Sequence, residues 1–281
     1  MTAEEKTSLS RFLNLTGDYL KGGYALSQED HAFTDDAQAE RTQPVETGTQ
    51  AEPAHLSGDL SSLPLAYQVD EDEEGETIPN IADLAAAIHS CTACGLSATR
   101  THTVPGEGVS RPLVMVIGEG PGADEDAAGR PFVGKAGQLL DRMLASIGLF
   151  RDKNCYIANM VKCRPPENRD PTPGEIAACF PFLEQQIALL RPRVILCAGR
   201  VAAQNLLKTS RGIHALRGTF AEYKSESENV FTHVSPPFGD IIPVLCTFHP
   251  SAILRDESNK RPAWEDLKLL RSKLDSLVGD T

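Results

Sequence analysis

The segment PLVMVIGEGPGADEDAAGRPFVGKAGQLLDRMLASIG, residues 112–148, predicts the fold of this chain. It opens with a continuous apolar run, residues 112–118, which is typical of a strand buried on both faces. A glycine-rich turn follows. Residues 135–148 then place leucine and methionine at helical spacing and end in glycine. A buried strand, a loop and an amphipathic helix in this order indicate a parallel sheet covered by helices.

The same alternation continues along the chain. Further strands are expected at residues 154–160, 193–199 and 242–250, and further helices at residues 81–90, 172–190, 200–207 and 261–277. The sequence therefore predicts an α/β protein with three layers (α/β/α) around a central, mainly parallel, four-stranded sheet. Ligands of such sheets bind at the carboxyl ends of the strands. The loops that begin at Gly118, Asn159 and His249 are therefore expected to meet.

The first 80 residues differ in composition from the rest. They contain 4 Lys and Arg against 17 Asp and Glu, and so account for the net charge of −12 of the whole chain. Residues 1–24 have the apolar spacing of a short amphipathic helix, which we interpret as a docking arm for a protein partner. Residues 25–80 read as an acidic, flexible linker, so a largely disordered extension is expected before a catalytic domain at 81–281. A solubilising tail without a partner is one alternative, and an acidic tether that mimics DNA and inhibits the domain in cis until it is displaced is another.

The composition of the chain and its N-terminal sequence also indicate the cellular compartment. No window approaches the roughly 18 to 20 apolar residues of a membrane span, and the N-terminus lacks the pattern of a secretory signal. We therefore expect a cytoplasmic monomer without membrane association. Seven cysteines in a reducing compartment favour metal ligands and buried thiols over disulfides.

Four of the cysteines have the spacing of a metal site. They form a C-x2-C pair and, further along, a C-x15-C pair: Cys91, Cys94, Cys163 and Cys179. Four thiolates gathered from distant segments predict a metal centre, and such a set suits zinc as well as iron–sulfur chemistry. The other three fall within apolar strands and are expected to be core thiols: Cys155, Cys197 and Cys246.

Several separated segments together resemble the family 4 (type 4) uracil-DNA glycosylases, the iron–sulfur group of bacteria and archaea. The matching segments are GEGPGADEDAAGRPFVGKAGQLLDRML (118–144), NMVKCRPPENRDPTPGEIAACFPFLEQQI (159–187), HPSAILR (249–255), CTACGL (91–96) and LRGTF (216–220). The resemblance spans roughly residues 81–275. Glu119 favours family 4 over family 5, whose turn usually lacks a Glu after the first glycine.

The resemblance implies a monofunctional base-excision repair enzyme. Such an enzyme flips uracil out of single- or double-stranded DNA and hydrolyses its N-glycosidic bond, leaving an abasic site and free uracil. The resemblance also implies that the four cysteines hold a [4Fe-4S] cluster with a structural or DNA-binding role. Spacing alone leaves zinc open.

The resemblance assigns roles to individual residues. His249 is expected to donate to uracil O2 as the bond breaks, and Glu119 to orient the attacking water. Phe132 is expected to stack on the base, and Asn159 to distinguish uracil from cytosine by its hydrogen-bonding edge.

Other positions have supporting roles. Gly120 is expected to bind the substrate, Glu125 to lie near the base, and Asn168 to support the site. For the acidic run around Glu125, helix capping is the alternative. Leu254 is expected to wedge into the DNA and Arg255 to contact phosphate. Further candidates for a basic groove are Arg164, Arg169, Arg211, Arg217, Lys260 and Arg261.

Three other interpretations were weighed. Some relatives bind uracil-DNA covalently through a His in a basic insertion, but residues 163–173 contain no His. A nucleic-acid-binding module without activity is disfavoured by the intact set Glu119, Phe132, Asn159 and His249. A zinc-stabilised nucleotide hydrolase would need a phosphate loop, and the turn at residues 118–122 lacks the Gly-Lys-Ser/Thr ending of one.

Overall fold

A computed structural model describes residues 80–224 and 241–279 of the chain. The helix expected within residues 1–24 and the linker expected at residues 25–80 lie outside the described residues, except for Asn80. Within the expected catalytic domain, residues 225–240 and 280–281 also lie outside the described residues.

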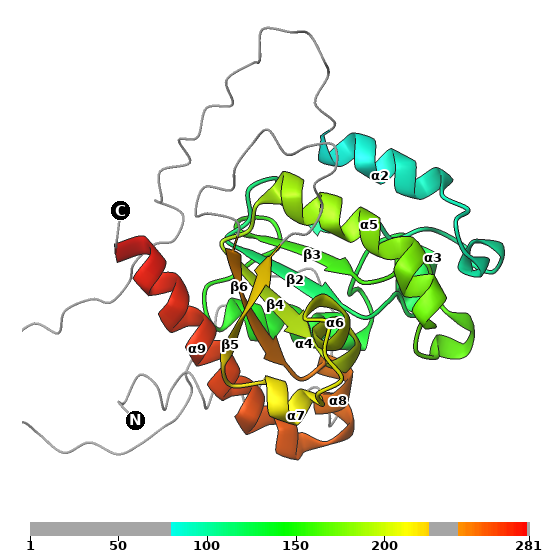
Figure 1. Ribbon diagram of the computed structural model, residues 1–281. Coiled ribbons are helices and arrows are strands. Elements are labelled where there is room, and N and C mark those ends of the chain that lie inside the picture. The colour runs from blue at the N-terminus through cyan, green and yellow to red at the C-terminus, as the bar shows by residue number, and fades with distance from the viewer. Residues whose placement is uncertain (1–79, 225–240, 280–281) are drawn as a thin grey trace, which may run out of the picture.

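The described residues form one six-stranded sheet with the order β1-β3-β2-β4-β6-β5 (Figure 1). The strands are β1 (Glu107–Gly108), β2 (Val114–Gly118), β3 (Cys155–Asn159), β4 (Val194–Ala198), β5 (Phe220–Lys224) and β6 (Ile241–Thr247). The inner four, β3, β2, β4 and β6, run parallel, and the edge strands β1 and β5 pair antiparallel to them.

The predicted parallel strands are confirmed, but the expected total of four strands is wrong. The two missed strands carry weak sequence signals. β1 has only two residues, and β5 is mostly exposed, so neither contains the continuous apolar run that marks a strand buried on both faces. Both lie at the edges of the sheet, where such a run is not required.

Helices cover both faces of the sheet, which confirms the three-layer architecture (Figure 1). They are α2 (Ile81–Ser90), α3 (Ala123–Ala128), α4 (Lys135–Ala145), α5 (Pro173–Leu190), α6 (Arg200–Leu206), α7 (Ile213–Leu216), α8 (Pro250–Arg255) and α9 (Lys260–Gly279). Val114 and Val116 of β2 share a core with α4, α8 and α9. Met115 and Ile117 share the other core with α5, α6 and α7, as the alternation of side chains along a strand requires.

Capping side chains fix where two helices begin. Asn80 accepts hydrogen bonds from the backbone N–H groups of Ala82 and Asp83 at the start of α2. Thr172 and Glu175 form a capping box at the start of α5, where Pro173 occupies the first turn. α2 packs against α5, and this contact brings the cysteine pair that follows α2 close to Cys179 of α5.

Candidate active site and cysteine site

One cavity of about 540 Å³ lies at the carboxyl ends of the parallel strands. Nine of the residues predicted from the sequence line it: Glu119, Gly120, Glu125, Phe132, Asn159, Asn168, Arg169, His249 and Arg255. They come from the loop after β2, the end of β3 and its following loop, and the segment after β6. The three loops meet at one edge of the sheet, as the topology of parallel strands requires.

Asn159 presents an unpaired acceptor to this cavity. Its side chain is 2% exposed, and its Oδ1 has no hydrogen-bond partner among the described residues. Gly118, at the end of β2, makes the close packing around Asn159 feasible. A Cβ at Gly118 would lie 2.4 Å from Asn159 Oδ1 and 2.6 Å from Phe132 Cζ. The two residues expected to hold the base therefore converge over a position that only glycine fits.

Phe132 adopts a backbone conformation that is uncommon for a residue with a side chain. Its φ is +53°, in the left-handed region. Gly137 makes room for this turn, because a Cβ there would lie 1.9 Å from the carbonyl oxygen of Phe132. The Phe132 ring is buried, and its centroid lies 5.6 Å from that of His249. The ring forms a wall of the cavity next to the imidazole.

Glu125 holds the turn around Phe132. Its Oε1 accepts from the backbone N–H groups of Val133 and Gly134, both at 2.9 Å, and its Oε2 accepts from Gly122 at 3.0 Å. These contacts match the helix-capping alternative, since Gly122 and Glu125 form the N-terminal cap of α3. Glu125 also lines the cavity, and its contact with the base stays a prediction.

His249 is held as a neutral imidazole with a defined tautomer. The backbone N–H of Ser251 donates to Nδ1 at 3.2 Å, so Nδ1 carries no proton and the ring proton lies on Nε2. Burial, together with the positive charge of Arg255, lowers the pKa of His249 to about 4. Gly199 allows this packing, because a Cβ there would lie 2.9 Å from His249 Cβ.

Glu119 titrates near neutral pH. Burial, together with the negative charge of Asp170, raises its pKa to about 7, against the positive charges of Arg200 and Arg255. Asp170 and Arg200 form an ion pair and also line the cavity. Neither residue is among those predicted from the sequence. Arg200 could have been predicted, because it follows β4 at the same carboxyl edge of the sheet as the predicted residues.

Two residues expected to contact DNA lie in different surroundings. Leu254 is partly buried against the core that contains α4 and α9, and it does not line the cavity. Arg255 lines the cavity and donates to Ser251 Oγ at 3.3 Å. Asn168 accepts from Arg164 Nε at 2.8 Å, which ties the loop after Cys163 together. The wedge role of Leu254 stays a prediction.

Three candidates for a basic groove are already paired with acidic side chains. Arg169 pairs with Glu175, and Lys260 pairs with Glu257. Arg217 is bound to Asp266, a fully buried carboxylate on α9, and it also stacks over the Phe248 ring. Because Phe248 directly precedes His249, Arg217 stabilises the end of β6 and is not free to contact DNA.

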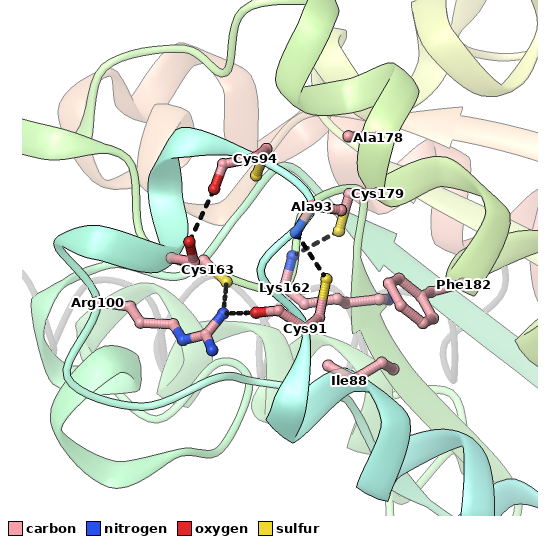
Figure 2. A pocket seen from close by; sticks show the side chains of 11 residues that line it. Ile88, Cys91, Ala93, Cys94, Arg100, Lys162, Cys163, Ala178, Cys179 and Phe182 are labelled. Carbon is pink, nitrogen blue, oxygen red and sulfur yellow. Dashed lines mark hydrogen bonds between the residues drawn. The ribbon is translucent and has the colours of Figure 1, made fainter.

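The four predicted metal ligands line one small cavity (Figure 2). Three of their sulfurs receive N–H donors. Arg100 Nη1 donates to Cys163 at 3.2 Å, and the backbone N–H of Lys162 donates to Cys179 at 3.3 Å. The backbone N–H of Ala93 lies 3.5 Å from the Cys91 sulfur. N–H groups directed at sulfur stabilise thiolates, the form that binds metal.

This donor set fits an iron–sulfur cluster by its chemistry. All four side chains are thiols, none is in a disulfide, and they come from three separate segments. Among the described residues, no three potential ligands lie close enough together to hold a metal ion as they stand, so donor type and not coordination geometry identifies the site. The remaining cysteines are buried in strands, as expected: Cys155, Cys197 and Cys246.

Comparison with known proteins identifies the family. The uracil DNA glycosylase superfamily model matches residues 105–268. The type-4 uracil-DNA glycosylase of Archaeoglobus fulgidus is 42% identical over 179 residues, covering 62% of this chain and 83% of the relative. The type-4 enzyme of Pyrobaculum aerophilum is 39% identical over 190 residues, covering 68% and 92%. The chain therefore belongs to the uracil DNA glycosylase superfamily and, within it, to the type-4 uracil-DNA glycosylases.

The predicted choice between two related families is confirmed as well. A type-5 uracil-DNA glycosylase of Thermus thermophilus is 36% identical over 118 residues, which covers only 37% of this chain and 53% of the relative. Uracil-DNA glycosylase activity in DNA repair, the function expected from the sequence, goes with membership in the type-4 family. No helix among the described residues is long and apolar enough to cross a membrane.

Proposed function

We propose that the protein removes uracil from DNA in the cavity at the carboxyl edge of its sheet, where Asn159, Phe132, His249 and Glu119 act on the nucleotide. The observation that carries this assignment is the buried Oδ1 of Asn159, which has no partner among the described residues. An unsatisfied buried acceptor costs about 1–3 kcal/mol. Its presence beside a cavity is expected where a ligand supplies the donor.

Recognition of the base requires that the nucleotide leave the DNA stack. The Asn159 amide can then accept from uracil N3–H through Oδ1 and donate to O4 through Nδ2. Cytosine has an acceptor at N3 and a donor at N4, so both contacts would be mispaired. The Phe132 ring supplies an apolar face on which the base stacks.

Bond cleavage leaves uracil as an anion whose charge spreads to O2. The Nε2–H of neutral His249 is the donor for this oxygen, because the contact from Ser251 fixes the proton on Nε2. A neutral donor can stabilise the anion without transferring its proton. A donor placed where charge develops contributes about 10²- to 10³-fold to the rate.

Glu119 acts on the other side of the reaction. As a carboxylate it offsets the positive charge that builds on the sugar, and it orients the water that attacks the anomeric carbon. Its pKa of about 7 means that the ionised form dominates only in neutral to alkaline solution. The predicted roles of Gly120 and Asn168 in holding the substrate are part of the same proposal, since both line the cavity.

The proposal includes a [4Fe-4S] cluster held by Cys91, Cys94, Cys163 and Cys179. Its contribution there would be structural, because it joins the segment after α2 to the loop after β3 and to α5. We further propose a cytoplasmic monomer that acts on single- or double-stranded DNA. The free thiols of all seven cysteines support a reducing compartment.

An excision assay tests this function. An end-labelled oligonucleotide with one uracil is incubated with iron-loaded protein and then treated with alkali, which breaks the strand at an abasic site. We expect scission at uracil and none in a thymine control. Both His249→Ala and Asn159→Ala should lower the rate by about 10²- to 10³-fold, whereas Lys153→Ala, at an exposed position outside the cavity, should not. Absence of scission by the iron-loaded wild type would overturn the proposal.

A further inference from the structure

Lys162 is a charged side chain in an unusual place. It is 1% exposed and belongs to the largest fully buried side chains of the protein. Its Nζ donates to the carbonyl oxygen of Asn159 at 2.8 Å and to Gln186 Oε1 at 2.6 Å. Gln186 is itself fully buried and donates to the carbonyl oxygen of Pro105 at 2.8 Å. The ammonium group is therefore fixed in position by a buried hydrogen-bond network.

This network contains no negative charge. Both acceptors of Lys162 are neutral, and among the described residues no carboxylate forms an ion pair with it. A buried ammonium group is strongly unfavourable unless an opposite charge lies nearby. Among the described residues, a counter-charge that would stabilise this ammonium group is therefore not a carboxylate.

The cysteine site can supply this counter-charge. Lys162 lines the same small cavity as the four cysteines, directly precedes Cys163, and donates its backbone N–H to Cys179 Sγ at 3.3 Å (Figure 2). A cluster with four thiolate ligands is a net anion, and nearby charges and N–H donors tune its stability and potential. Lys162 thus lies beside the predicted negative centre.

The side chain of Lys162 also contacts the residue that is proposed to bind the base. Asn159 ends β3, and Lys162 follows three residues later in the chain. The ammonium group therefore fixes the backbone of the residue whose amide faces the cavity.

We propose that Lys162 is a positioning residue that links the cysteine site to the uracil pocket. Its ammonium group balances the charge of the cluster and at the same time holds the Asn159 carbonyl, so that the Asn159 amide keeps its place. This inference rests on the proposed function, in which Asn159 reads the base. It adds a role for a residue that touches neither the substrate nor, through its side chain, the metal ligands.

Two substitutions separate the charge from the hydrogen bonds. Lys162→Gln removes the charge and keeps an N–H donor, whereas Lys162→Met removes both at similar length. Lys153→Gln and Lys153→Met, at an exposed position, are matched controls. The stability of the cluster is measured as the rate of iron release to a chelator, which is monitored by the loss of visible absorbance. Inhibition by free uracil measures the pocket independently of bond cleavage.

We expect both Lys162 variants to release iron about tenfold faster than their controls, because each lacks the positive charge that balances the cluster. The reduction potential of the cluster should become more negative. Per iron-loaded molecule, Lys162→Met should excise uracil at least about tenfold more slowly and bind free uracil more weakly, and Lys162→Gln should be closer to wild type. If Lys162→Met does not fold, Lys162→Gln alone decides the iron-release part.

Two results would overturn the proposal that Lys162 links the cysteine site to the uracil pocket. The first is iron release and uracil inhibition equal to the controls in both variants. The second is faster iron release with unchanged inhibition by uracil, which would leave Lys162 a counter-charge only. If instead the wild type excises no uracil, the proposed function fails, and the iron-release measurement still decides whether Lys162 balances the cluster.

Discussion

At the scale of single residues, Glu119 is the residue assigned to catalysis whose charge changes near neutral pH. Its folded pKa of about 7 lies above the ordinary value of 4.5, chiefly because burial disfavours the carboxylate. The pKa of His249, about 4, keeps the imidazole neutral from weakly acid to alkaline pH. The two residues assigned to catalysis therefore titrate in well-separated ranges, and of the two it is Glu119 that changes charge near neutrality.

We predict that kcat/KM for uracil excision rises with pH and levels off above about pH 7, because the ionised Glu119 is the active form. Below that point the rate should fall about tenfold per pH unit. Glu119→Gln should be slower and nearly independent of pH from about 5.5 to about 7.5. A pH profile of the two proteins on one uracil oligonucleotide measures this. Equal slopes in both would exclude Glu119 as the titrating group.

The same shift has a consequence for stability. A carboxyl group whose pKa is raised on folding binds its proton more tightly in the folded state, so folding loses stability as pH rises from 4.5 to about 7. We predict that Glu119→Gln is more stable than wild type at pH 8 and equal to it at pH 4. Thermal unfolding at the two pH values measures the difference. A variant less stable at pH 8 would contradict the prediction.

The hydrogen-bond partners of Glu125 could not be predicted from the sequence. The sequence places a carboxylate six residues after Glu119, and the family resemblance suggests that it lies near the base. Whether its oxygens are free depends on the turn at residues 132–134, which folds back onto the start of α3. That contact depends on the left-handed backbone of Phe132, and no spacing rule predicts a positive φ at a phenylalanine.

At the scale of elements, the end of β2 determines the shape of the pocket. Gly118 pairs with Asn159 in the parallel register of β2 and β3. Because the strands end side by side, any side chain at Gly118 would enter the space that Asn159 and Phe132 occupy. The glycine that ends the apolar run is therefore required by the site and not only by the turn.

We predict that Gly118→Ala lowers uracil excision by about 10²-fold or more, since a displacement of about 1 Å at a reacting site has that effect. Overpacking should also destabilise the protein by about 1–3 kcal/mol. Gly174→Ala, in the first turn of α5 and without neighbours within 4 Å, is the matched control and should leave excision unchanged. Excision rates and thermal unfolding of both variants decide the question. Normal excision by Gly118→Ala would show that the pocket adapts.

The strands that were predicted correctly from the sequence are those buried on both faces of the sheet. The four parallel strands are apolar along most of their length, since both faces are covered. The edge strands failed for the opposite reason. β5, with the sequence FAEYK, buries mainly Tyr223, so its composition does not differ from that of a loop.

At the scale of the whole molecule, topology explains why so many site residues were predictable. Strands β2, β3 and β6 all point their carboxyl ends to one edge, so residues spread over more than 100 positions meet in one cavity. What the sequence could not provide was the state of each side chain: Leu254 lies against the core, and Arg217 is engaged by Asp266. Such pairings depend on three-dimensional packing, which spacing does not encode.

Charge is distributed unevenly along the chain. Residues 1–79 contain 17 acidic and 4 basic residues, whereas the remainder of the chain is close to neutral. DNA is a polyanion, so an acidic segment joined to its binding domain opposes association over distances of about 30 Å at 10 mM salt, but only about 8 Å at 150 mM. The acidic segment should therefore inhibit mainly at low ionic strength.

We predict that a chain lacking residues 1–79 excises uracil with a severalfold higher kcat/KM than the full chain at about 10 mM salt, and that the two differ by less than about twofold at about 150 mM. A full-length variant with the acidic residues of VDEDEEGE (69–76) changed to Asn and Gln is the control, because it alters charge without altering length. It should move toward the truncated chain. Loss of excision on truncation would instead show that residues 1–79 belong to the fold, and equal rates at both salt concentrations would show that their charge does not act on DNA binding.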